Sequence, residues 1–234
     1  MKKIGFIVFA VCIVVGLAFA NFFSVGRVTN QLFNFKVDIG DRVSGSGNSA
    51  TERRDVSSFN EIEVSGAFQV EIVAGKDFSV ELQADDNILP LIQTKVSGDT
   101  LQIELTQSVK TKSGMIVRVS APNIERVQSS GAAKITASGI KNEQFSIDAN
   151  GASKIILNGE TGRLGIDVTG ASNIDAEQLV AGTVNIDSSG ASKIAVNAKD
   201  EIHTQASGAS RITYTGDPKT VESQTSGSSS ITKK

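Results

Sequence analysis

Apolar and polar residues alternate along most of the chain after about residue 55. In Phe145–Ala149 and Leu164–Val168 every second residue is apolar, and polar residues or glycine stand between them. A period of two residues is the pattern of a β-strand, and no 3.6-residue stripe of a helix competes with it. We therefore predict an all-β protein.

A short motif separates the alternating runs and returns at a nearly constant distance. Its fullest form is Gly-Ala-Ser, then one variable residue, then isoleucine, and successive copies are 20, 19, 20, 18 and 19 residues apart. Short strands and tight turns in a unit of this length are typical of stacked β-coils. We predict a right-handed parallel β-helix, or β-solenoid, with about 19–20 residues per coil. The copies begin at Gly131, Gly151, Gly170, Gly190, Gly208 and Gly227.

The alternation also predicts which residues of the motif lie inside. If the isoleucines point inward, they form one aliphatic row, and the serine before each of them lies inside or at a corner. The glycine then supplies the backbone conformation or the close approach that the corner needs. The residue between serine and isoleucine points outward. These outward residues are Lys134, Lys154, Asn173, Lys193 and Arg211, with Ser230 in the last copy.

Residues 55–128 alternate clearly but repeat less regularly. Gly75–Asp77 and Ser97–Asp99 separate neighbouring runs in the manner of hairpin turns. Asp85–Pro90 is predicted as an insertion with a short helical turn. Terminal units of a solenoid are often atypical because they cover an open edge, so we count residues 55–234 as one domain.

The N-terminus has the pattern of an export signal. Lys2 and Lys3 precede an uncharged apolar run, Ile4–Ala20, which ends in Ala-Phe-Ala. Residues 1–20 are therefore a signal peptide cleaved after Ala20, or a retained N-terminal anchor, since the run approaches the length of a membrane span. Residues 21–54 are predicted as a linker. We expect the rest of the protein in the periplasm, at the cell surface or anchored to the envelope.

Composition excludes several classes of function. The net charge is -2, tryptophan is absent and there is one tyrosine, so neither a basic field nor stacking aromatics favour nucleic-acid binding. The single cysteine, Cys12, lies in the apolar run, which leaves the exported part without a disulfide. The single histidine, His203, is interpreted as a surface residue. We expect no metal site and no cofactor.

Two outward rows could take part in function. Lys134, Lys154, Lys193 and Arg211 form a basic row, which is either a solvated face or a ligand-binding stripe. Asp148, Asp167 and Asp187 form an acidic row on neighbouring coils. We interpret the acidic row as structural, with weak calcium binding or carboxylate catalysis as alternatives.

The motifs also resemble a known family. Ser-Gly-Ala-Ser-Lys-Ile copies at this spacing, preceded by the segment Arg54–Gly66, are similar to the bacterial head GIN domain family, described as putative auto-transporter adhesins. The resemblance covers roughly Phe59 to Gly216. It implies an exported β-solenoid on the bacterial envelope with an adhesive role, and it offers no catalytic residues to transfer.

Three functions follow from these observations. The leading hypothesis is a non-enzymatic envelope protein whose flank binds another protein or a surface glycan, and which meets a membrane only through an uncleaved N-terminal segment. The second is a structural solenoid that associates with itself. The third is a β-helix carbohydrate-active enzyme, which requires the acidic row to converge with a basic residue in a cleft.

Overall fold

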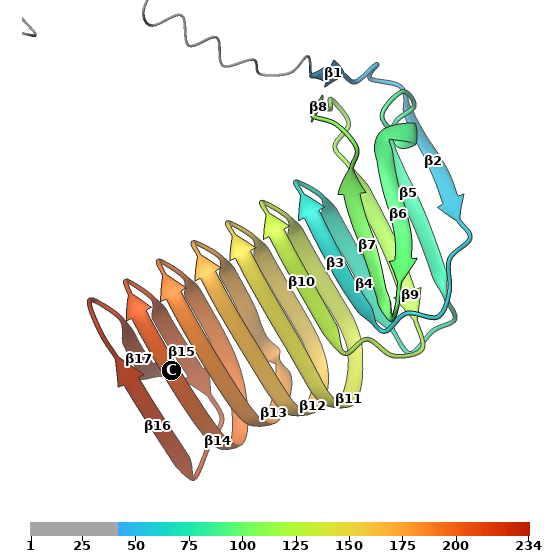
Figure 1. Ribbon diagram of the computed structural model, residues 1–234. Helices are drawn as coiled ribbons and strands as arrows, with labels where there is room; N and C mark the ends of the chain where they lie inside the picture. The colour runs from blue at the N-terminus through green and yellow to red at the C-terminus, as the bar shows by residue number, and fades with distance from the viewer. Residues whose placement is uncertain (1–41) are drawn as a thin grey trace, which may run out of the picture. The chain divides into compact units, whose positions relative to one another are not determined.

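The computed structural model describes residues 42–234, which form a parallel β-solenoid (Figure 1). The predicted signal or anchor, Cys12 and most of the predicted linker lie outside the described residues. The all-β solenoid prediction is confirmed. No helix within residues 42–234 combines the length and the apolar character that a membrane span requires.

Four long strands form the regular part of the solenoid, and each one follows most of a coil. Neighbouring strands pair in parallel and in register, so that Lys154 lies between Lys134 and Asn173, and Gly170 lies between Gly151 and Gly190. Register shifts occur only midway along the strands. The strands are β11 (Lys134–Gly151), β12 (Lys154–Gly170), β13 (Asn173–Gly190) and β14 (Lys193–Gly208).

Each coil has two flat faces that meet at the glycine. We call the face before the glycine the pre-glycine face; it contains the ends of β11–β14, β10 (Arg126–Gly131) and β16 (Thr220–Thr225). The post-glycine face contains the beginnings of β11–β14, β15 (Arg211–Thr215) and β17 (Ser230–Lys233). Each face is one continuous parallel ladder in this part of the chain.

The N-terminal coils continue both faces and then close them with antiparallel strands. On the pre-glycine face β10 pairs with β3, β3 with β7 and β7 with β6. On the post-glycine face β11 pairs with β4, β4 with β9, β9 with β5 and β5 with β2. The bounds are β2 (Ser49–Arg54), β3 (Glu61–Gly66), β4 (Gln69–Ala74), β5 (Ser79–Asp85), β6 (Ile92–Ser97), β7 (Thr100–Leu105) and β9 (Ile116–Ala121).

Only one of the two predicted hairpins exists. Gly98 and Asp99 join β6 to β7, whose Ser97 and Thr100 are direct partners. The prediction of a hairpin at Gly75–Asp77 was wrong, because β4 and β5 do not pair and β9 lies between them. A glycine-rich turn looks the same in sequence whether it joins neighbouring strands or passes over a third one. The predicted helical turn is the 3₁₀ helix η1 (Leu89–Leu91).

Part of the predicted linker belongs to the sheet. β2 (Ser49–Arg54) pairs antiparallel with β5, and β1 (Val43–Ser44) pairs in parallel with β8 (Val109–Lys110). The Ser-Gly composition of residues 44–49 is typical of flexible linkers. This composition gives no sign of the pairing with β5. The edge of β5 has backbone N–H and C=O groups that need partners, and β2 provides them.

The core is a set of stacked aliphatic rows, as the alternation predicts. The motif isoleucines of five successive copies, at 135, 155, 174, 194 and 212, have no exposed surface. The sixth, Ile231, is only half-buried. The inward side chains of the two faces pack against each other in one thin core. The inward positions are therefore occupied by small and branched residues.

The glycine corner is as tight as the motif predicts. Gly170 has φ +137°, and a Cβ added there would lie 2.4 Å from the carbonyl oxygen of Gly151. The serines of the four Gly-Ala-Ser copies are buried, with Ser172 2 % exposed, and the Ser172 hydroxyl donates to the Gly151 carbonyl at 3.3 Å. Glycine allows the coils to approach, and serine satisfies backbone oxygens inside the corner.

Candidate functional site

The basic row lies directly beside the glycine corner, on the post-glycine face. Each member is the first residue of its strand, and the backbone register places all of them side by side with Asn173 in the gap. All the side chains are exposed, and within residues 42–234 none of the four cations has an ion-pair partner. The structure thus places the predicted residues Lys134, Lys154, Lys193 and Arg211 in one unpaired basic ladder.

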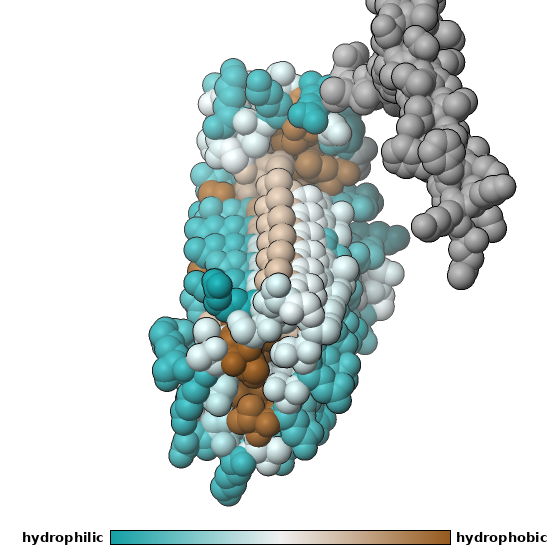
Figure 2. Space-filling model, turned by 90° about the vertical axis from the view of Figure 1, so that its left-hand side faces the viewer, coloured by the Kyte–Doolittle hydropathy of each residue, from teal (hydrophilic) through white to brown (hydrophobic). Residues whose placement is uncertain are grey.

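The corner beside the ladder carries almost no side-chain bulk. The residue after each corner glycine is alanine in most coils, and these alanines are exposed. Figure 2 shows a narrow strip of weakly hydrophobic surface along this edge, with hydrophilic surface beside it. An extended molecule lying along the edge would meet the basic ladder without steric obstruction from the corner.

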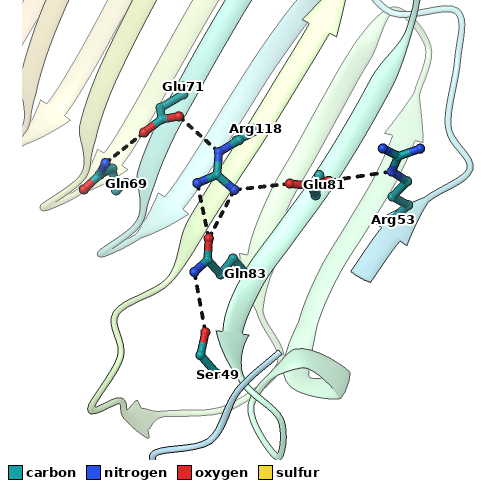
Figure 3. A network of polar contacts seen from close by, with 7 residues as sticks. All are labelled: Ser49, Arg53, Gln69, Glu71, Glu81, Gln83 and Arg118. Carbon is teal, nitrogen blue, oxygen red and sulfur yellow. Dashed lines mark hydrogen bonds and ion pairs between the residues drawn. The ribbon is translucent and has the colours of Figure 1, made fainter. Parts of the chain in front are cut away.

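A network of mixed charge limits the basic ladder at its N-terminal end. Gln69, the neighbour of Lys134 in β4, donates to Glu71 at 3.0 Å, and Glu71 forms an ion pair with Arg118 at 3.3 Å. Arg118 also contacts Glu81 at 3.2 Å (Figure 3). Because Gln69 is uncharged and Arg118 is paired with these glutamates, the row of unpaired cations ends at Lys134 on this face.

The acidic row lies on the pre-glycine face and lines a shallow groove. Asp148, Asp167 and Asp187 are register partners on neighbouring coils, and Gln205 and Gln224 continue the row. A parallel row contains Arg126, Ser146, Gly165, Asn185, His203 and Glu222. The space between the rows is about 440 Å³. The missing side chain of Gly165 contributes to the hollow, and sequence parity alone did not indicate it.

Arg126 partly neutralises one end of the groove. Its Nε lies 3.6 Å from Oδ2 of Asp148, and its Nη1 lies 3.9 Å from Oε1 of Glu61. Burial raises the pKa of Asp148, Arg126 partly offsets this, and the charges of Asp167 and Glu61 add to the rise. Of the three aspartates in the row, Asp148 alone has a cation partner among residues 42–234.

His203 lies at the other end of the groove between two glutamates. Its Nδ1 is 3.1 Å from Oε2 of Glu222, and its Nε2 is 3.4 Å from Oε2 of Glu201. The hydrogen bonds to Glu201 and Glu222 raise the pKa of His203. Its outward position was expected, but Glu222 comes from the next coil and could be assigned only once the register was known.

A buried carboxylate organises the N-terminal end away from both rows. Asp85 has no exposed surface and accepts hydrogen bonds from the Ser113 hydroxyl at 2.6 Å, the Thr111 hydroxyl at 3.0 Å and the Lys112 backbone N–H at 3.0 Å. The bond from Ser113 and then that from Lys112 lower the pKa of Asp85 to about 2. These donors all belong to one loop, so Asp85 has a structural role.

Metal binding has no geometric support in the described part of the chain. Within residues 42–234 no three or more His, Cys, Asp or Glu side chains are grouped closely enough to hold a metal ion. The acidic row places its carboxylates side by side along a ladder. Calcium requires oxygen ligands that surround the ion, and a single row provides them from one side only.

Comparisons with known proteins agree with the motifs. The family model described as "Putative auto-transporter adhesin, head GIN domain" matches residues 58–218. A solved structure described as a putative adhesin from Bacteroides fragilis has a TM-score of 0.66 and 20% identity, and the match covers 82% of this chain and 99% of that one. A second such structure, from Parabacteroides merdae, has a TM-score of 0.58 and 19% identity over 82% and 99%. No curated protein matches.

Proposed function

The chain belongs to the head GIN domain family, and on this basis we propose that it is an exported, non-enzymatic binding module of the bacterial cell envelope. The family's description as adhesins and the N-terminal pattern of Lys2-Lys3 followed by an apolar run support this proposal. The compartment we propose is the periplasm or the cell surface, with the N-terminal segment either removed or retained as an anchor.

The basic ladder is the surface that we assign to binding. One observation carries this assignment: Lys134, Lys154, Lys193 and Arg211 are exposed, unpaired within residues 42–234, and aligned along one edge. Neighbouring coils are about 4.8 Å apart, so the row spans about 19 Å. A linear anionic polymer, such as an acidic surface glycan or an acidic segment of a protein, matches a row of this form.

Binding of a defined polyanion tests the proposal. The protein fragment is residues 42–234, which has its own core and corresponds to nearly the whole length of the solved neighbours. The probe is an oligogalacturonate, with a neutral glucan of equal length as its control. We expect saturable binding of the acidic polymer only, weakened as salt rises because the contacts are exposed ion pairs.

A matched pair of variants locates the site. The triple variant Lys134→Ser, Lys154→Ser, Lys193→Ser should lose at least tenfold in affinity. The control variant, Lys76→Ser, Lys95→Ser, Lys112→Ser, removes the same charge from exposed lysines outside the ladder and should bind almost as the wild type does. No saturable binding, or equal losses in the two variants, would remove the assignment of the ladder.

The acidic groove supports a second candidate, a carbohydrate-active site. Asp148, Asp167 and Asp187 share a groove with Arg126, which is the arrangement that this alternative requires. Glycosidases need two carboxyl groups on either side of the scissile bond, whereas these three lie in one row. Release of reducing ends from soluble polysaccharides, lost in Asp167→Asn, would favour the enzyme over the binding module.

A further inference from the structure

The last coil that the structure describes contributes one strand to each face, β16 and β17. β16 pairs with β14 and β17 pairs with β15, and within residues 42–234 neither strand pairs on its other side. Val221 is the register partner of the buried Ile202 but is itself 42 % exposed, and Ile231 is half-exposed whereas its partner Ile212 is fully buried. Figure 2 shows hydrophobic surface between hydrophilic flanks at this end of the molecule.

The hydrogen bonds show which backbone groups face the free edge. Ser226 N–H donates to the Ala206 carbonyl at 2.9 Å, and Ser230 N–H donates to the Ser210 carbonyl at 2.9 Å. Along a strand the backbone groups of successive residues point to opposite sides. The even-numbered residues therefore bond to the preceding coil, and the odd-numbered residues, among them Val221, Ser223 and Ile231, direct their N–H and C=O groups outward.

A two-fold axis can pass through both strands. Ser223 lies four residues before Gly227 and Ile231 lies four residues after it, so they stand at the same height on the two faces. An axis through Ser223 and Ile231 would cross the last coil from the pre-glycine face to the post-glycine face. Rotation about it would set β16 antiparallel to β16 of another molecule, and β17 antiparallel to β17.

We propose that this end binds the same end of a second copy, which forms a closed tail-to-tail dimer through both faces. The register centred on Ser223 and Ile231 joins only outward-pointing backbone groups. It also places Val221 opposite Thr225 and Glu222 opposite Gln224 of the second copy, so no like charges in β16 stand opposite one another. A register centred on Glu222 would set that carboxylate against itself and would present groups already bonded to β14.

The opposite end is a poorer partner for the C-terminal coil. Its edge strand β2 carries Glu52, Arg53 and Arg54 in succession, and its other edge strand, β6, carries Lys95. Charged residues on edge strands discourage pairing with another chain. A head-to-tail contact would also continue without limit, whereas the two-fold contact closes after two copies.

The first test measures the mass of the 42–234 fragment by light scattering over a range of concentrations. We expect a twofold rise in mass from monomer to dimer. Ser223→Pro removes an outward N–H while leaving the bonds of Glu222 and Gln224 to β14, so this variant should remain monomeric. Ser223→Thr keeps the N–H and should dimerise. Circular dichroism checks that both variants fold.

The second test uses a symmetric disulfide. The only cysteine of the chain is Cys12, so the fragment contains none. Residues facing each other in a hydrogen-bonded antiparallel pair have Cα atoms about 5.5 Å apart, which is within disulfide range. Ser223→Cys should give a covalent dimer under mild oxidation, whereas the exposed Gln205→Cys, one coil away, should not. A fragment that stays monomeric, forms open-ended polymers, or cross-links equally through both cysteines would overturn the proposal.

Discussion

At the scale of single residues, the corner glycines leave no room for a side chain. A Cβ on Gly170 would meet the Gly151 carbonyl oxygen at 2.4 Å in a backbone with φ +137°, whereas one on Gly165 would meet nothing nearer than 3.7 Å. We expect Gly170→Val to destabilise the fold by about 3 kcal/mol or more and Gly165→Val to be nearly neutral. Thermal unfolding of both variants measures this. Equal losses would contradict steric crowding at the corner.

A second prediction at this scale concerns the pKa of His203. Because the chain has one histidine, its NMR titration is unambiguous. The contacts with Glu201 and Glu222 should raise its pKa above 6.5, and Glu222→Gln should lower that value. A raised folded-state pKa means that its contribution to stability is complete below pH 6.5 and is lost as the pH rises through the folded pKa. His203→Gln should remove this part of the pH dependence of unfolding, and an unshifted titration would refute the contacts.

At the scale of elements, Asp85 links the end of β5 to the loop 111–113. Asp85→Asn keeps the size of the side chain but loses the charge, which weakens the bonds from Ser113 and Lys112. We expect the loop to be cleaved faster by protease in this variant, while β11–β14 stay protected. Ser108→Ala, in the same region but outside the Asp85 hydrogen bonds, is the control.

The same carboxylate gives the loop a defined acid sensitivity. Its pKa is lowered from 3.8 to about 2, so its contribution to stability is present above pH 3.8 and is lost as the pH falls toward 2. Proteolysis with an acid protease at pH 4 and at pH 2 should show the loop opening only at the lower pH. Opening already at pH 4 in the wild type would contradict the hydrogen bonds.

The regular elements were predictable because each coil repeats one local rule. Ile155 and Ser153 are buried and Lys154 is exposed, as the alternation predicts. The repeat period also predicts which residue of the neighbouring coil lies beside each of them. The N-terminal elements were not predictable to the same degree. The insertion of β9 between β4 and β5, and the pairing of β2 with β5, depend on contacts far apart in the chain.

The candidate site was likewise predictable only in part. The members of the basic ladder could be listed from the sequence because they occupy one position of the motif. The groove could not, because it needs Arg126 from β10, the absent side chain of Gly165 and the contact of Glu222 with the preceding coil. A repeat predicts which residues form one row. The contacts between neighbouring rows depend on the folded coil and could not be predicted in the same way.

At the scale of the whole molecule, the proposed dimer changes how the ladder would bind. An axis perpendicular to the faces leaves each post-glycine face on the same side of the dimer. Both basic ladders would then face the same surface, and a long polymer or a dense layer of glycans could engage both. Two linked sites raise the overall affinity through effective concentration without any new contact.

The dependence of affinity on polymer length tests this arrangement. For oligogalacturonates binding to the 42–234 fragment, we expect affinity to rise until the polymer covers one ladder, about 19 Å, and to rise again when it reaches the second. Ser223→Pro should keep the first rise and lose the second, because it separates the copies and leaves the lysines intact. The Lys134→Ser, Lys154→Ser, Lys193→Ser variant should lose both. A second rise that persists in Ser223→Pro would show that the longer polymer binds another part of one molecule, since the two ladders would no longer be joined.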